Sequence, residues 1–120
     1  VADPGAFPLS DEGPRLERHP RFPERTNVEA IAVVGPHCVR MRVWERGVGE
    51  TRACGSGACA AAVAAIVDGG CASPVTVDMP GGSVEVGVDD ELRLTLTGTA
   101  QRVYEAELDD AFLAQLERAV

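Results

Sequence analysis

The feature that most constrains the fold of this chain is a run of small apolar residues at positions 53–68. The run reads ACGSGACAAAVAAIVD. Alanine is the strongest helix former, so the run predicts a helix from Ala53 to Asp68 that ends at Gly69 and Gly70. Because the run is small and apolar on every face, we expect this helix to be buried on all sides.

Period-two patterns of apolar residues on both sides of this run predict strands. The expected strands span residues 28–34, 39–44, 75–79, 84–88, 92–97 and 101–107. The first two form a hairpin around Gly35 and Pro36, and a polar loop follows at 45–52. A helix of alanine and glycine lets strands approach closely. We therefore expect an α+β fold, a β-roll or barrel of mostly antiparallel strands wrapped around one buried central helix.

The two ends of the chain have a different character. Residues 1–26 are rich in proline, glycine and charge, which predicts an extended lead-in with a short helix at Asp11–Arg18 capped by Ser10. Asp109 or Asp110 is expected to cap a final helix. The 120 residues suit one domain. Because the chain opens without methionine, we expect it to be an excerpted or processed portion of a protein.

Charge and cysteine content argue against several functional classes. The net charge is −8, and all eleven basic residues are arginine. An acidic chain without a basic stripe is not expected to bind nucleic acid or a membrane surface. Its four cysteines contain no C-x-x-C pair, and its two histidines are not spaced as zinc partners. These features predict reduced thiols in the cytoplasm and no metal site.

Cys54 is the candidate catalytic residue, because it directly precedes the predicted helix. Unpaired N–H groups of a first turn stabilise negative charge, which favours a thiolate that can act as a base. The small residues Gly55, Ser56 and Gly57 leave those N–H groups open to a carboxylate. A carboxylate bound there would hold its α-carbon beside the Cys54 sulfur, which suggests proton transfer at that carbon. Cys59, deeper in the helix, is interpreted as a small buried apolar residue.

Longer motifs resemble a known family. Residues 45–61 read ERGVGETRACGSGACAA, residues 22–27 read FPERTN, and residues 77–82 read VDMPGG. Together they resemble the diaminopimelate epimerases over nearly the whole chain. The resemblance implies an enzyme of two similar domains that uses no cofactor or metal. One thiolate removes the α-proton and a second thiol returns a proton to the opposite face. This interconverts L,L- and meso-diaminopimelate in lysine and peptidoglycan biosynthesis.

The resemblance also implies roles for residues around Cys54. Asn27, Glu45 and Arg46 would contact the distal amino-acid end of the substrate, where arginine suits a carboxylate and the other two suit an ammonium. Glu45 would in addition influence how readily the reacting thiols ionise. Gly55 and Ser56 would bind the reacting carboxylate through backbone N–H groups.

The motif expected around the family's first catalytic cysteine, of the Gly-Asn-x-x-Arg-Cys kind, has no match in this chain. We therefore expect residues 1–120 to form the C-terminal half of a two-domain epimerase, without the N-terminal catalytic domain. This half should be inactive alone, and the full enzyme should be a homodimer. Three alternatives stay open: a separate chain that supplies the first half, a racemase of another amino acid, and a non-catalytic amino-acid-binding module.

Overall fold

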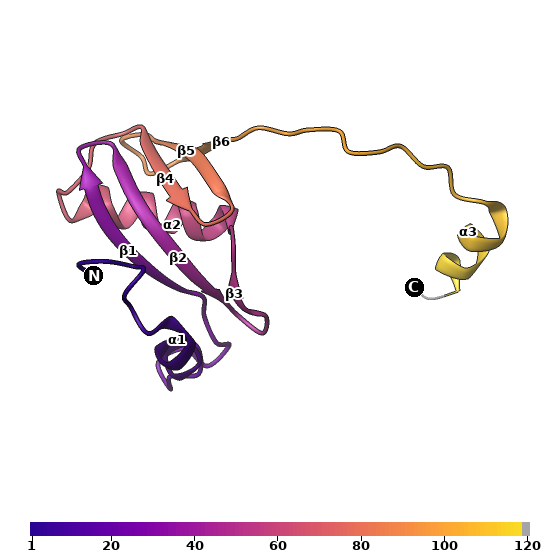
Figure 1. Cartoon of the computed structure of the whole chain (residues 1–120), viewed down its shortest axis with the longest axis horizontal. Helices are drawn as coiled ribbons and strands as arrows, with labels where there is room; N and C mark the ends of the chain where they lie inside the picture. The colour runs from indigo at the N-terminus through magenta and orange to yellow at the C-terminus, as the bar shows by residue number, and fades with distance from the viewer. Residues whose placement is uncertain (119–120) are drawn as a thin grey trace.

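A computed structural model describes residues 1–118, which form a mixed six-stranded sheet and three helices (Figure 1). The elements in chain order are α1 (Leu9–Glu17), β1 (Val28–Gly35), β2 (Cys38–Glu45), β3 (Gly49–Thr51), α2 (Gly55–Val67), β4 (Val75–Met79), β5 (Gly82–Val88), β6 (Leu94–Thr97) and α3 (Asp110–Glu117). The strand order is β1-β2-β4-β5-β6, and β3 pairs with β2. Only the β2–β4 pair is parallel.

The core forms where α2 packs across one face of the sheet (Figure 1). The buried side of α2 consists of the small residues Gly57, Ala58, Ala61, Ala62 and Ala65. They meet apolar side chains of the three central strands, namely Val39, Met41, Val43, Val75, Val77, Met79 and Val86. Burial of these strand side chains supplies the hydrophobic driving force, and the small helix residues let the helix backbone approach the sheet closely.

The expectation of a roll or barrel closed around the helix is wrong. The described sheet is open, because β1 and β6 are the two ends of the strand order. On the side of α2 away from the sheet, Ala60, Ala64 and Val67 are exposed. The apolar sequence of the helix predicted that other parts of the protein bury it on every side. The strands described here bury only one face of the helix. The α+β class itself is confirmed.

Most predicted strands are confirmed with small shifts in their ends, and two segments differ. Residues 45–52 are not only a loop, since β3 pairs antiparallel with the end of β2. The strand predicted at 101–107 is wrong, because residues 98–109 have no regular structure and pair with nothing described. An alternating sequence forms a strand only where a partner strand satisfies its backbone groups.

The last helix, α3, is confirmed, and it begins as predicted with Asp109 as its N-cap. The Asp109 carboxylate accepts a hydrogen bond of 2.7 Å from the Phe112 N–H. Figure 1 shows α3 at the end of the extended segment, away from the sheet. Among residues 1–118, no helix is long and apolar enough to cross a membrane.

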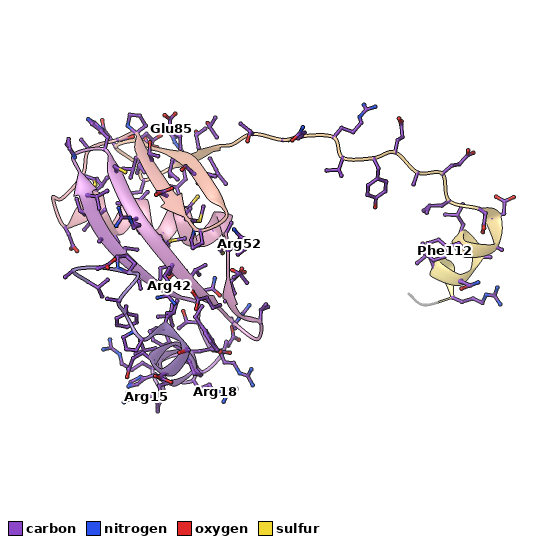
Figure 2. The ribbon with its side chains drawn as sticks, viewed as in Figure 1. Arg15, Arg18, Arg42, Arg52, Glu85 and Phe112 are labelled. Atoms are coloured by element: carbon purple, nitrogen blue, oxygen red, sulfur yellow. The ribbon has the colours of Figure 1, made fainter. Side chains whose placement is uncertain are left out.

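The lead-in segment packs against the β2–β3 hairpin through α1. This helix begins at Leu9 with Pro8 as its N-cap, not at Asp11 with Ser10 as predicted. The indole of Trp44 lies directly on Gly13, where a Cβ atom would be only 2.7 Å from the ring. Arg42, labelled in Figure 2, adds hydrogen bonds to backbone carbonyls of the lead-in, including Pro4 at 2.8 Å. The lead-in is therefore an ordered part of the domain.

Replacing Gly13 with alanine should destabilise the domain, because the new methyl group would overlap the Trp44 ring, which is fixed by the hydrogen bond from its indole N–H to Glu17. Overpacking of this kind typically costs about 1–3 kcal/mol. Urea unfolding followed by Trp44 fluorescence measures the loss. Ser10→Ala, an exposed change in the same helix, should leave the midpoint nearly unchanged. Equal midpoints for Gly13→Ala and the unmodified chain would contradict this packing.

Candidate functional site

Cys54 lies at the N-cap of α2, as the sequence predicts. Its backbone is extended, with φ −147° and ψ 115°, and its sulfur accepts a hydrogen bond from the Gly57 N–H at 3.4 Å. The Cys54 carbonyl accepts the N–H of Ala58 at 2.9 Å. The side chain is 8% exposed. The sulfur therefore occupies the place of a capping oxygen, where the first turn offers an N–H group and the positive end of the helix dipole.

Two further polar groups surround the Cys54 sulfur. The side-chain amide of Asn27 points its nitrogen at the sulfur at 3.9 Å, and the Ser56 hydroxyl lies 3.4 Å from it. The amide oxygen of Asn27 accepts the backbone N–H of Arg46 at 2.8 Å. This contact fixes which end of the amide faces the thiol, because the oxygen is already engaged. Asn27 thus ties the turn after β2 to the start of α2.

A cavity of about 360 Å³ opens beside this cluster. Its wall is formed by Arg25, Thr26, Asn27, Glu29, Arg46, Ser56, Gly57 and Ala60. Three of the residues predicted from the sequence, Asn27, Arg46 and Ser56, are among them. The wall carries two guanidinium groups and one carboxylate, so it can meet both charges of a zwitterion.

Three predicted residues lie outside this wall, namely Glu45, Gly55 and Cys54, whose sulfur adjoins the wall residues Asn27 and Ser56. The carboxylate of Glu45 accepts a hydrogen bond from the Thr51 hydroxyl. Gly55 is the first residue of α2, and a Cβ there would lie 3.2 Å from a methyl carbon of Leu96. Cys59 is partly buried against the core, as expected for a small apolar residue. The structure therefore brings Asn27 and Ser56 to the Cys54 sulfur and places Arg46 in the adjoining cavity wall, whereas Glu45 ends β2 and is engaged by Thr51.

Glu29 is a cavity residue that our sequence analysis missed. It shares a face of β1 with Ile31, which packs against the core, and with Val33, which approaches Gly70 just after α2. Burial raises the pKa of the Glu29 carboxyl, and the nearby charge of Glu45 raises it further. The sequence contained a signal for this residue. The alternation along residues 29–33 predicts an apolar side chain at position 29, where a glutamate stands instead.

Glu17 is a second residue that the sequence did not reveal. Its carboxylate is buried, with 3% of the residue exposed. It accepts hydrogen bonds from the Trp44 indole at 2.8 Å and from the Gly47 N–H at 3.0 Å, and Arg25 lies 3.6 Å away. The indole hydrogen bond lowers the pKa of the Glu17 carboxyl most strongly. Glu17 thereby holds the turn that carries Arg46, and it also attracts Arg25. Both arginines line the cavity.

Residues 1–118 contain no cluster of three or more side chains able to hold a metal ion. The side-chain groups at or beside the cavity are a thiol, an amide, hydroxyls, a carboxylate and two guanidinium groups.

Glu29→Gln should stabilise the isolated chain at neutral pH. Because the carboxyl has a raised pKa, the folded state holds its proton more tightly than the unfolded chain, and stability falls as pH rises above the usual value of 4.5. Glutamine removes this penalty. Thermal melts from pH 4 to pH 8 should show a higher midpoint for the variant near neutral pH and convergence at low pH.

The matched control for this prediction is Glu85→Gln, since Glu85 is an exposed carboxylate on β5 (Figure 2). Its midpoints should follow those of the unmodified chain throughout. Parallel pH profiles for Glu29→Gln and the unmodified chain would contradict the assigned burial cost.

Comparison with known proteins places this cluster in a family. Residues 2–103 match the family model described as diaminopimelate epimerase. The diaminopimelate epimerase of Azotobacter vinelandii is 53% identical over 102 residues, which cover 84% of this chain and 37% of the relative. The enzymes of the same name from Pseudomonas fluorescens and Pseudomonas entomophila are 49% and 50% identical over 109 residues, which cover 90% of this chain and 40% of each relative. The chain thus spans about two fifths of the length of these curated relatives. It belongs to the diaminopimelate epimerase family.

Proposed function

We propose that this chain is the C-terminal portion of a diaminopimelate epimerase and supplies one of its two thiol acid/bases, Cys54. The reaction interconverts L,L- and meso-diaminopimelate, which serves lysine and peptidoglycan biosynthesis in the cytoplasm. The observation that carries this proposal is the Cys54 sulfur at the N-cap of α2, beside a polar cavity in a chain of this family.

The first turn of α2 accounts for the reacting end of the substrate. Backbone N–H groups of Gly55 and Ser56 would bind this carboxylate; the position of both residues in the first turn of α2 supports this, since a helix N-terminus attracts anions. The α-carbon of that ligand would lie near Cys54. A thiolate there takes the α-proton, and the helix dipole and the Gly57 N–H stabilise the negative charge before transfer.

The rest of the cavity accounts for the distal end of the substrate. The Arg46 guanidinium offers a fork for a carboxylate, and it is held by a hydrogen bond of 3.1 Å to the Glu24 carbonyl. Asn27 lies between this arginine and the thiol, so it can contact the chain that joins the two ends. The negative charge of Glu45, at the end of β2, would influence how readily the thiols ionise.

One thiol cannot complete the reaction. A planar intermediate needs a proton donor on the face opposite Cys54, and it must be shielded from water. Arg25, Arg46, Ser56 and Ala60 line the cavity yet are exposed, so the described residues leave it open to solvent. In this proposal the second thiol and the shielding come from an N-terminal domain, within a homodimer. No cofactor is needed, because thiols perform both proton transfers.

The test restores the remaining three fifths of the enzyme. The matching segment of the Azotobacter vinelandii relative is replaced by residues 2–103, and epimerisation is followed by NMR in deuterated water. The chimera should exchange the α-proton of L,L-diaminopimelate and form the meso isomer, whereas the isolated chain should not form it. A chimera that folds but epimerises another amino acid would show that the substrate assignment is wrong.

Two cysteine variants of this chimera test the role of the thiol. Cys54→Ala should lower epimerisation by at least about 100-fold, because it removes an acid/base group. Cys59→Ala is the matched control, as it changes a partly buried cysteine of the same helix, and most activity should remain. Equal losses from the two changes would refute the assignment of Cys54.

A further inference from the structure

Glu29 lies against the first turn of α2. Its Oε1 atom is 2.9 Å from the position that a Cβ atom on Gly57 would occupy. The Cβ atom of Cys54 is 3.4 Å from the same point. The carboxylate and the thiol-bearing residue therefore flank one glycine, and the absence of a side chain at Gly57 gives Glu29 its place in the cavity.

The Glu29 carboxylate is met by its own backbone N–H, and it has no ion-pair partner among residues 1–118. The two guanidinium groups of the wall are engaged, Arg25 with Glu17 at 3.6 Å and Arg46 with the Glu24 carbonyl at 3.1 Å. A partly buried carboxylate costs free energy when it is charged and unpaired, so the site is suited to an external cation.

The charges around the cavity define the ligand further. Arg25 and Arg46 come from the segment before β1 and from the turn after β2, whereas Glu29 lies by the first turn of α2. A ligand in the cavity would therefore meet positive charge from the two guanidinium groups and negative charge from Glu29. An amino acid matches this arrangement, because its carboxylate suits the guanidinium groups and its ammonium suits the carboxylate.

We propose that Glu29 binds an ammonium group of the substrate and contributes to selectivity for diamino dicarboxylic acids over dicarboxylic acids that lack amino groups. The proposal rests on the function proposed above, since it concerns the ligand of the same cavity. Glutamine at this position would keep the size and polarity of the side chain and lose its charge. The effect of the charge can therefore be separated from the effect of the side chain's shape.

The test measures ligand binding by the ¹⁵N-labelled chain at neutral pH. L,L-diaminopimelate and pimelate, which has the same carbon chain without amino groups, are titrated against the amide resonances of Asn27 and Ser56. In the unmodified chain diaminopimelate should bind more tightly than pimelate. Glu29→Gln should reduce this preference at least about tenfold, as expected for loss of a charge-assisted hydrogen bond. The control Glu85→Gln should keep it.

A second measurement needs no variant and so does not depend on folding of the mutant. The ¹³C resonance of the Glu29 carboxyl is followed against pH with each ligand at saturation. An ammonium beside the carboxylate favours its charged form, so diaminopimelate should lower the pKa of Glu29 and pimelate should not.

The outcomes separate the two proposals. If diaminopimelate binds at Asn27 and Ser56 but Glu29→Gln keeps the full preference over pimelate, or the carboxyl titration does not move, the role of Glu29 is overturned while the cavity assignment stands. If neither ligand shifts these resonances in the unmodified chain, the cavity does not bind the substrate in this chain and the role of Glu29 is overturned, whereas the epimerase proposal is decided by the chimera.

Discussion

The contact between the alanine face of α2 and the central strands determines where everything else in this domain lies. Because Ala58, Ala61 and Ala62 project little from the helix, its backbone settles close to the strands instead of standing off on larger side chains. That closeness brings the first turn of α2 level with the start of β1, where Asn27 and Glu29 lie. The cavity is thus a product of core packing, and its polar groups are placed by residues that never touch a ligand.

A second constraint comes from the buried carboxylate of Glu17. One side chain joins the end of α1 to Trp44 and to Gly47, and it also attracts Arg25. The hairpin that presents Arg46 would otherwise be free to move as an exposed turn. The charge is tolerated in the interior because two N–H donors and the Arg25 guanidinium surround it, which is the usual condition for burying a carboxylate. The lead-in segment therefore serves the site although it contributes few residues to its wall.

The sequence allowed the central part of this structure to be predicted, because local signals there agree with tertiary packing. The composition of residues 53–68 predicts α2 and places Cys54 at its start, and alternation identifies most strands. The errors have physical causes. The alternation at 101–107 predicted a strand that does not form, because no described strand edge pairs with it. The residues of α2 are apolar on every face, which predicted a closed roll that the described strands do not form. Glu17 was missed because its partners are distant in sequence. Glu29 interrupts the apolar alternation of residues 29–33, but the helix that partly buries it is distant in sequence.

The capping role of Cys54 gives its sulfur a property that an ordinary reactive thiol lacks. The atom is shielded by the turn that it caps, and it is engaged by the Gly57 N–H. Because the residue is only 8% exposed, a reagent has to approach the sulfur from the side of the cavity, as the α-carbon of a substrate would. Local opening of the first turn of α2 would widen that approach, so the rate of covalent labelling would respond to the stability of one helix end. The potency of an electrophilic inhibitor aimed at this thiol would then depend on its shape as well as on its intrinsic reactivity.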